Sequence, residues 1–470
     1  MKPNILIVTP YGIGLRDTLL NKDFHQYLTN QFNIDVLSPF HIKDPVEKWG
    51  IRNTFPMNPK GILSRIFGLF NSYANTIHMR LIYKEFYRKS NWLDVYEILL
   101  GYDERRIRKT PHYEKWDLVA KTPIGYLARK VLSHFPFKYP PASILNEHQY
   151  KFVLVDSPTD ANCNIMAMAA KKKRIPVVCR PMGLDNFFSG GPMVMNPDLF
   201  LLWGREQKEQ LENKLAQAND NFKTAQYRSI GPLSHDFIYG HADPINTFES
   251  FYPEIDTSKM VITFAAYSKQ GDPGQLETCK TILNFFTDNR INGHLIVRHR
   301  PSVDKDIWES FAKENPETVT IQVPEGASYA KRFGGITVNR DAEIGQINLY
   351  SATLHRSDLV ITGGFSTVFL DSFAAGTPAI ATALSSISSN DKFLSKAYEV
   401  YGKHLNSIAS AGIISTKEVL KANLEKFIRV GGAETQMEKC RNVYDEIAGT
   451  LDCKSGQRAS QAIIGLLNQH

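Results

Sequence analysis

Short runs of β-branched and aliphatic residues alternate with longer segments of helical periodicity along the whole chain. This alternation is typical of parallel sheets whose two faces are covered by helices. In the first half, the predicted strands are Asn4–Thr9, Ile34–Ser38, Phe152–Asp156, Pro176–Cys179, Leu199–Trp203 and Ser229–Gly231. In the second half, they are Met260–Ala265, His294–Arg298, Val319–Val323, Ile336–Val338, Leu359–Thr362 and Ala379–Thr382. The pattern predicts two doubly wound α/β units in tandem.

The length of the chain favours two domains. A chain of 470 residues exceeds the usual size of one domain, and its 43% of hydrophobic residues can fill two cores. We expect an N-terminal Rossmann-like domain over residues 1–235, a C-terminal one over residues 259–415, and helices over residues 416–470. The boundary falls near His235 to Ser258, where Pro, Gly and acidic residues lack sustained periodicity. Residues 51–150 are expected to form a helical insertion in the first domain.

Basic residues are concentrated in this insertion. Residues 51–150 hold 16 Lys and Arg against 8 Asp and Glu, so they carry about the whole net charge of +7. Within Arg65–Trp92, apolar and basic residues are interleaved, a pairing that favours anionic membrane surfaces. Two interpretations stay open: a lipid-facing patch, and ordinary amphipathic helices with buried apolar sides. Nucleic acid is not an expected partner, because no helix-turn-helix, zinc-finger or RNA-stacking motif accompanies the charge.

The sequence favours a cytoplasmic location. The apolar stretch Asn4–Pro10 is too short for a signal-peptide core, and no apolar run reaches the roughly 18 residues of a membrane span. The five cysteines are scattered without a Cys-x-x-Cys pair, which fits a reducing compartment. We expect a cytoplasmic protein, with the inner face of the cytoplasmic membrane as a peripheral surface.

The segment Ser357–Thr382 has the pattern of a phosphate-binding loop. Its sequence, SDLVITGGFSTVFLDSFAAGTPAIAT, has a buried strand, a turn with two glycines, two hydroxyl residues suited to a helix cap, and a helix. The free N–H groups of such a helix start suit a phosphate at the carboxyl edge of a parallel sheet. The residues that this segment offers to a ligand are Gly363, Gly364, Ser366 and Thr367. The alternative is a tight capped turn without a ligand.

A second segment, GHLIVRHRPSVD, places Arg298, His299 and Arg300 at the end of another predicted strand. Charged residues crowded at a strand end are costly to desolvate unless an anion meets them, so we expect a diphosphate clamp. The alternative is a surface loop with solvated charges.

Metal binding is not expected. The Asp304-Lys305-Asp306 triplet lies where a helix starts after Pro301, and capping explains it better than metal ligation. We therefore expect neither a metal nor another cofactor.

In their order along the chain, these motifs resemble the C-terminal domains of bacterial GT-B glycosyltransferases and of the related CDP-glycerol glycerophosphotransferases. The N-terminal segments ILIVTPYGIGLRDTLL, RPMGLDNFFSGG and LFLLWGREQKEQL are similar to surface-polysaccharide glycosyltransferases. The likeness spans most of the chain as loose motifs. It implies two Rossmann-like doubly wound domains that face each other across a cleft, with the C-terminal helices crossing back to the first domain.

The resemblance also implies roles for single residues. Related enzymes often bind the nucleotide base near the position of Glu325, and often place a Glu that contacts a ribose or sugar hydroxyl where this chain has Asp371. This sequence departs from the pattern at Asp371 and also at Arg300, which stands where those families usually place His before Pro.

Acidic residues of the first half are candidates for the general base of an inverting transfer. Gly12 and Gly14 follow the first strand, but Asp17 stands where a dinucleotide fingerprint has its third glycine. We expect this loop and the loop with Asp185 to face the cleft, where a carboxylate can deprotonate an acceptor hydroxyl. The order of preference is Asp185, Asp17 and His25. The alternative for the two carboxylates is a cap or turn role, and a retaining transfer needs no such base.

The predicted function is the transfer of a sugar from a nucleotide-sugar donor to a bacterial surface glycan, such as capsule or lipopolysaccharide, or to a lipid-linked glycan. Three alternatives share the architecture. They are a CDP-alcohol-type polyol-phosphate transferase, a nucleotide-sugar 2-epimerase and a non-catalytic GT-B binding protein.

Overall fold

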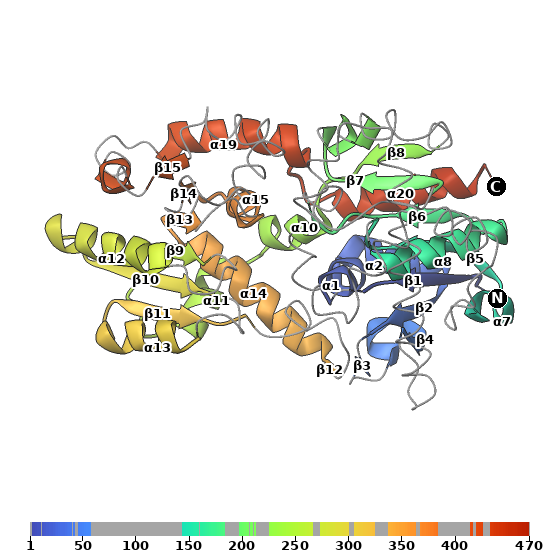
Figure 1. Ribbon diagram of the computed structural model, residues 1–470, viewed down its shortest axis with the longest axis horizontal. Helices are drawn as coiled ribbons and strands as arrows, with labels where there is room; N and C mark the ends of the chain where they lie inside the picture. Colours follow the sequence, from blue (N-terminus) through green and yellow to red (C-terminus); the bar gives the residue numbers. More distant parts are fainter. Residues whose placement is uncertain are drawn as a thin grey trace, which may run out of the picture.

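Two parallel sheets, each covered by helices on both faces, lie at the two ends of the long axis (Figure 1). This arrangement confirms the predicted α/β class with two Rossmann-like units. The computed structural model describes residues 2–10, 12–39, 41–42, 46–57, 143–158, 160–183, 197–205, 207–209, 211–212, 225–266, 273–299, 305–324, 337–362, 367–383, 414–416, 420–425 and 433–469.

The first sheet has the order β4-β2-β1-β5-β6-β7-β8, and its paired strands run parallel. The strand bounds are β1 (Asn4–Val8), β2 (Asn33–Ser38), β4 (Ile51–Pro56), β5 (Tyr150–Val155), β6 (Val177–Cys179), β7 (Leu199–Leu202) and β8 (Gln226–Ser229). The chain starts at the middle of the sheet and builds outward in both directions, so the strand order reverses between β1 and β5.

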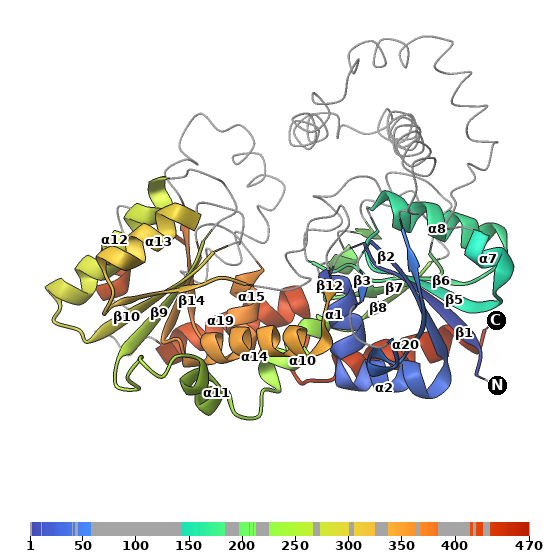
Figure 2. The same cartoon turned by 90° about the horizontal axis from the view of Figure 1, so that it is seen from below.

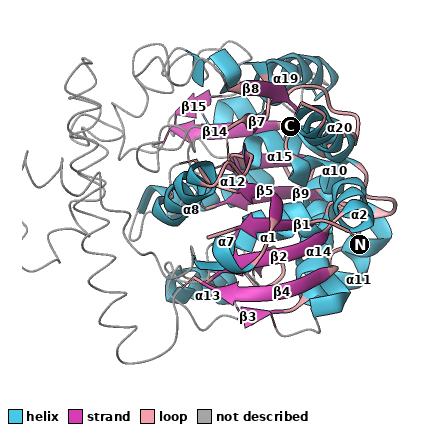
Figure 3. Ribbon diagram, turned by 90° about the vertical axis from the view of Figure 1, so that its right-hand side faces the viewer, coloured by secondary structure: helices cyan, strands magenta, loops and turns pink. Residues whose placement is uncertain are grey.

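Helices cover both faces of this sheet. Strand β1 sends Ile5 and Ile7 into one core and Leu6 and Val8 into the other. The first core is closed by α1 (Gly12–Leu20), α2 (Lys22–Gln31) and α20 (Ser455–Leu467), and the second by α7 (Ile144–Glu147) and α8 (Ala161–Lys172). Figure 3 shows α8 on one side of the strands and α2 and α20 on the other. Burial on both faces explains why the strand sequences are continuously apolar.

The second sheet has the order β11-β10-β9-β13-β14-β15 and is built in the same way. Its strands are β9 (Met260–Ala265), β10 (Gly293–Arg298), β11 (Val319–Gln322), β13 (Leu359–Thr362), β14 (Ala379–Ala383) and β15 (Ile414–Thr416). One face carries α12 (Pro273–Asp288) and α13 (Lys305–Glu314). The other carries α11 (Pro244–Phe251), α14 (Arg340–Arg356), α15 (Val368–Ala374) and α19 (Ala433–Ala448), as Figure 2 shows.

The chain passes between the two halves twice. The first passage is the segment predicted as the boundary, and it contains α10 (Leu233–Tyr239) and α11. The second leads from α19, which packs on α15, to α20, which packs on α2 in the first half. Gly456 lets α20 approach α2 closely, because a Cβ there would meet Asn21 Oδ1 and the backbone nitrogen of Phe24.

A short pair of strands also joins the halves. Strand β3 (His41–Ile42), after β2, pairs in parallel with β12 (Thr337–Val338), before α14. Nearby, Lys48 of the 3₁₀ helix η1 (Val46–Trp49) lies 3.4 Å from Asp341. The segments after β2 and after β11 therefore meet, so the carboxyl edges of both sheets open toward the same region.

Three predictions about the strands are wrong. Residues Ile51–Pro56 form strand β4 and not the start of a helical insertion; the strand is at the sheet edge, so buried and exposed residues alternate and conceal the apolar run. The segment predicted as Ile336–Val338 does not join the second sheet, because β12 pairs with β3. Strand β8 also ends two residues before the predicted Gly231.

The basic and apolar stretch Arg65–Trp92 lies outside the described residues, as does most of the predicted insertion. Among the helices that the structure describes, none combines the length and the apolar character needed to cross a membrane.

Candidate functional site

The carboxyl edge of the second sheet has the geometry of a ligand site. The strand order reverses between β9 and β13, and ligands of open α/β sheets bind outside such a reversal point. The register pairs Ala265 of β9 with Arg298 of β10 on one side and with Thr362 of β13 on the other. Arg298 and Thr362, the last residue of β13, therefore lie at one level, about two strand spacings or roughly 10 Å apart.

Arg298 is half-buried at this edge and is held from two sides. Its Nη1 donates to Gln322 Oε1 at 2.5 Å, and its guanidinium carbon lies 4.2 Å from the centre of the Tyr350 ring. The amide nitrogen of Gln322 donates to the hydroxyls of Tyr252 and Thr353 at 2.8 and 2.7 Å, which fixes the amide oxygen toward Arg298. The cation is therefore placed by the fold before any ligand binds.

Asp371, one turn into α15 as predicted, is bonded within the protein. Its Oδ2 accepts from the Tyr350 hydroxyl at 2.7 Å, and its Oδ1 accepts from His235 Nε2 at 2.8 Å. Its side chain is 15% exposed. The contact of Asp371 with a ribose or sugar hydroxyl stays a prediction. Asp371 would accept from that hydroxyl in addition to its bonds with Tyr350 and His235.

His235 connects Asp371 to a third helix. Its Nδ1 is hydrogen-bonded to the hydroxyl of Tyr444 in α19. Burial raises the pKa of Tyr444 well above its usual value, so this hydroxyl keeps its proton. The two ring nitrogens of His235 therefore contact side chains of two different helices, α15 and α19.

The other predicted donor residues have different positions. His299 is 2% exposed, and its ring stacks on Trp308 of α13, so it lies on the α12–α13 side of the sheet. Thr367 is the N-cap residue of α15, a position that the sequence predicted for it, but its side chain makes no capping hydrogen bond. The remaining predicted residues, Arg300, Glu325, Gly363, Gly364 and Ser366, lie outside the described residues.

The carboxyl edge of the first sheet holds a buried cluster of charges. Arg180, directly after β6, donates through Nη2 to Asp156 Oδ1 at 2.8 Å, and its Nη1 lies 3.7 Å from Asp17 Oδ2. Arg16 Nε donates to Asp17 Oδ1 at 3.0 Å. Asp156 is fully buried, and Asp17 and Arg180 are each 2% exposed. Burial raises the pKa of Asp156, and Arg180 opposes that shift.

Of the three candidate bases, Asp17 and His25 lie among the described residues, and both are engaged within the protein. Both oxygens of Asp17 face guanidinium groups, an arrangement typical of a structural ion pair. His25 Nε2 lies 2.9 Å from the Trp49 carbonyl oxygen, and burial lowers its pKa. Asp185 lies outside the described residues, so its assignment as a base stays a prediction.

Comparisons with known proteins identify the architecture. The sequence matches no protein-family model and no curated protein. The structure resembles that of UDP-GlcNAc 2-epimerase from Neisseria meningitidis bound to UDP-GlcNAc, with a TM-score of 0.54, 10% identity, and coverage of 99% of this chain and 100% of that one. The fold is GT-B. A glycosyltransferase from Rickettsia africae has a TM-score of 0.49 at 10% identity, with coverage of 100% and 99%.

At these identities the comparisons establish the GT-B fold alone. Neither description concerns CDP-glycerol chemistry, so that part of the resemblance stays a prediction.

Several residues of this GT-B site were not singled out from the sequence. Asp156 and Arg180 directly follow buried strands. A search for charged residues at strand ends, which selected Arg298, would therefore have found them too. Tyr350 and Tyr444 had no such signal. Their partners Asp371 and His235 are 21 and 209 residues away in sequence, and only the packed helices bring them together.

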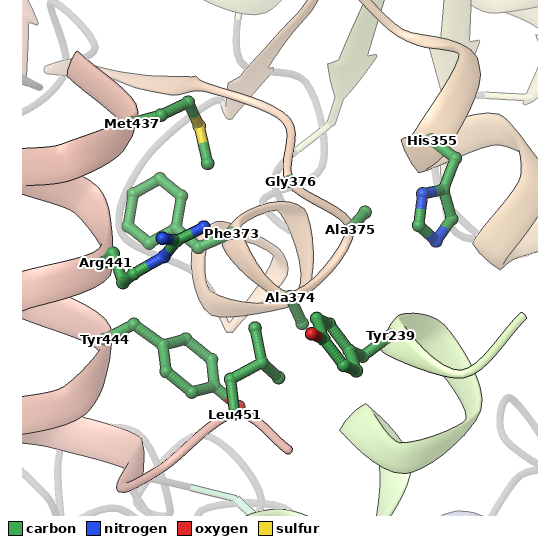
Figure 4. A pocket seen from close by; sticks show the side chains of 10 residues that line it. All are labelled: Tyr239, His355, Phe373, Ala374, Ala375, Gly376, Met437, Arg441, Tyr444 and Leu451. Carbon is green, nitrogen blue, oxygen red and sulfur yellow. The ribbon is translucent and has the colours of Figure 1, made fainter. Parts of the chain in front are cut away.

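A separate pocket opens at the C-terminal end of α15 (Figure 4). Arg441 and Tyr444 of α19 lie on one side of it, and Tyr239 of α10 lies on another. The lining residues are mainly apolar: Tyr239, His355, Phe373, Ala374, Ala375, Gly376, Met437, Arg441, Tyr444 and Leu451. Because Thr367 lies at the other end of α15, this pocket is distinct from the predicted donor loop.

No group of three or more His, Cys, Asp and Glu side chains in the described part of the chain could hold a metal ion. The predicted helix at the Asp304 triplet is present, since α13 begins at Lys305 with Asp306 in its first turn.

Proposed function

We propose that this protein is a metal-independent glycosyltransferase that moves a sugar from a nucleotide-sugar donor to a bacterial surface glycan or lipid-linked acceptor. The observation that carries the proposal is the placement of Arg298, at the carboxyl edge beside the reversal point of the second sheet. A guanidinium that Gln322 and Tyr350 already hold in place can stabilise the charge that develops on a departing nucleotide diphosphate.

The donor site in this proposal combines Arg298 with its neighbours in the sequence. The diphosphate contacts the guanidinium and the glycine-rich loop, and the nucleotide extends toward Glu325 and Asp371. The residues assigned to it are Arg298, Arg300, Glu325, Gly363, Gly364, Ser366, Thr367 and Asp371, whereas His299 is left out because it is buried against Trp308.

The acceptor binds on the side of the first domain. Asp185 is the preferred general base, because the oxygens of Asp17 are engaged by Arg16 and Arg180. Asp185→Asn is expected to lower kcat at least about a hundredfold while leaving nucleotide binding unchanged. Equal kcat in this variant and the wild type would contradict the assignment.

The test of the reaction is identification of the released nucleotide. UDP-, GDP-, CMP-, CDP- and dTDP-linked donors are incubated with a glycan acceptor, with and without EDTA, and products are analysed by chromatography and mass spectrometry. The proposal predicts acceptor-dependent release of one nucleoside phosphate and a product heavier by one sugar, unaffected by EDTA. Transfer of a polyol phosphate with release of CMP, or no product with any donor, would contradict it.

A nucleotide-sugar 2-epimerase is the second candidate. The observation that favours it is the similarity in fold to the Neisseria enzyme described as bound to UDP-GlcNAc. Incubation with UDP-GlcNAc in the absence of acceptor separates the two reactions. Formation of the 2-epimer, followed by NMR, would support the epimerase, whereas unchanged UDP-GlcNAc would exclude that activity on this substrate.

Peripheral binding to the inner face of the cytoplasmic membrane is part of the proposal. It rests on the interleaved basic and apolar residues of Arg65–Trp92. The protein is expected to sediment with anionic liposomes at low salt and to be released at high salt. Equal binding to neutral and anionic liposomes would contradict an electrostatic contact.

A further inference from the structure

The guanidinium group of Arg298 is restrained in two directions. Its Nη1 donates to Gln322 Oε1 at 2.5 Å, and the N–H bonds of a guanidinium lie in the plane of the group. This hydrogen bond alone leaves the group free to rotate about the line between the two atoms. The Tyr350 ring supplies the second restraint, because the guanidinium carbon lies over it at 4.2 Å from the ring centre. Gln322 therefore sets the direction of one N–H group, and Tyr350 limits the rotation about it.

The Tyr350 ring is itself anchored on a neighbouring helix. Tyr350 lies in α14, and its hydroxyl donates to Asp371 Oδ2 of α15 at 2.7 Å. The other carboxylate oxygen, Oδ1, is bonded to His235 Nε2 at 2.8 Å. Both oxygens of Asp371 are thus engaged, and its side chain is 15% exposed. A tyrosine side chain turns about two torsions, so a hydrogen bond at its far end holds the ring in one position against Arg298.

The position of the ring matters for the anion that Arg298 would bind. A guanidinium binds a phosphate most strongly through two parallel N–H groups, which requires the group to face the phosphate oxygens in its own plane. Asp371 does not itself attract a diphosphate, because both carry negative charge. A favourable effect of Asp371 on this ligand therefore passes through the Tyr350 ring to Arg298.

We propose that Tyr350 is a positioning residue, which its hydrogen bond to Asp371 fixes against Arg298 so that the guanidinium faces the diphosphate of the donor. The inference rests on the proposed function, since it requires a diphosphate at Arg298. It gives Asp371 a role in diphosphate binding that is separate from the predicted contact with a ribose or sugar hydroxyl. All of these contacts are formed within the protein itself, so they lower the cost of ordering Arg298 when the diphosphate binds.

A double-mutant cycle with inorganic pyrophosphate as the probe tests this role. Pyrophosphate has no ribose, so a contact between Asp371 and a ribose cannot influence the result. Tyr350→Phe keeps the ring and removes only the hydroxyl, and Asp371→Ala removes the acceptor of that hydroxyl. Asp371→Ala also removes a negative charge, but this effect is common to both arms of the cycle and cancels.

Calorimetry on the full chain measures the affinity for pyrophosphate and, in parallel, for UDP, GDP, CDP, dTDP and CMP. We expect Tyr350→Phe to weaken pyrophosphate binding about threefold in the wild-type background and to leave it unchanged in the Asp371→Ala background. Arg298→Met, which tests the donor site itself, should weaken pyrophosphate binding at least about tenfold.

Tyr444→Phe is the matched control. It also removes a buried hydroxyl, the one bonded to His235 Nδ1, but Tyr444 lies in α19 and lines the pocket at the C-terminal end of α15. We expect this variant to unfold at a lower temperature and to bind pyrophosphate like the wild type. A general loosening of the packed helices would instead weaken binding in both tyrosine variants.

Each outcome decides between the role of Tyr350 and the proposed function. Equal affinity of Tyr350→Phe and the wild type, an equal loss in the two backgrounds, or an equal loss in Tyr350→Phe and Tyr444→Phe would each overturn the role of Tyr350. If Asp371→Ala does not fold, the comparison of the two tyrosine variants still decides. A wild type that binds one of the nucleotides but not pyrophosphate would also overturn the inference and leave the proposed function standing. A wild type that binds neither pyrophosphate nor any of the five nucleotides would overturn both.

Discussion

The two sheets share one strand order, with one further strand at the edge of the first, but their carboxyl edges hold their arginines differently. At the first sheet, Arg180 is 2% exposed and is paired with Asp156 and Asp17. At the second sheet, Arg298 is half-buried, and a neutral amide and an aromatic ring position it.

Burying an arginine with carboxylates satisfies its charge within the protein, and removal of either partner then leaves a buried charge. Arg298 is held instead by contacts that include the Gln322 amide and the Tyr350 ring. The contacts of Arg180 are therefore those of a structural ion pair, and the binding role of Arg298 stays part of the proposed function.

The largest effect is expected from breaking the buried cluster. Arg180→Met leaves Asp156 fully buried without its cation, and should lower the free energy of unfolding by about 3–5 kcal/mol. Urea unfolding followed by circular dichroism measures the change. The control is Arg205→Met, which removes an ion pair with Glu209 at the surface. The side chains of Arg205 and Glu209 are 72% and 60% exposed, so the free energy of unfolding should change by less than about 0.5 kcal/mol. Equal effects of the two substitutions would contradict a structural role for the cluster.

A smaller effect concerns the response of the second domain to pH. In β10, burial and, to a smaller extent, the nearby Lys259 lower the pKa of His294 to about 4. Between pH 6.5 and 4 the unfolded chain binds a proton that the folded chain excludes, so stability falls as the pH drops through this range, by roughly 2–3 kcal/mol.

His294→Gln should flatten this dependence while leaving stability above pH 7 nearly unchanged. Thermal unfolding of the wild type and the variant at several pH values measures this pH dependence of stability. An unaltered slope between pH 4 and 6.5 in the variant would show that another group is responsible.

A still smaller effect is expected where the C-terminal helix packs on the first domain. At Gly456 a Cβ would meet Asn21 Oδ1 and lie 2.9 Å from the Phe24 nitrogen, so Gly456→Ala should destabilise by about 1–2 kcal/mol. Gly465 in the same helix has no atom within 4 Å of such a Cβ, so Gly465→Ala should stabilise by about 0.5–1 kcal/mol. Thermal unfolding of the two variants gives the comparison, and a stabilising Gly456→Ala would disprove the close contact.

The central strands of the two sheets could be predicted from the sequence, whereas the strand at the edge of the first sheet and the strand pair between the domains could not. Met260–Ala265 and Leu359–Thr362 were predicted at their observed bounds, because strands buried on both faces are continuously apolar. The edge strand Ile51–Pro56 was taken for part of a helical insertion, because exposed Arg52 and Thr54 interrupt the apolar pattern and only one face packs. The extended pair β3–β12 depends on contact between the domains, which no local pattern encodes.

The candidate site was predictable in part for a similar reason. Arg298 is the last residue of a buried strand, and a cation at a strand end is visible in the sequence. The contacts that hold it are not visible, because Tyr350, Asp371 and His235 come from three helices that only tertiary packing brings together. The sequence therefore indicated the edge of the sheet that could bind an anion, but not the side chains that position its cation.

The most direct test of the account is calorimetric titration of the wild type and Arg298→Met with UDP, GDP, CDP, dTDP and CMP. The account predicts that one nucleotide binds the wild type, and that Arg298→Met weakens this binding at least about tenfold, or 1.4 kcal/mol, without a change in unfolding temperature. Equal affinity in the two proteins, or no binding of any nucleotide to the wild type, would contradict the assignment of the second sheet as the donor-binding edge.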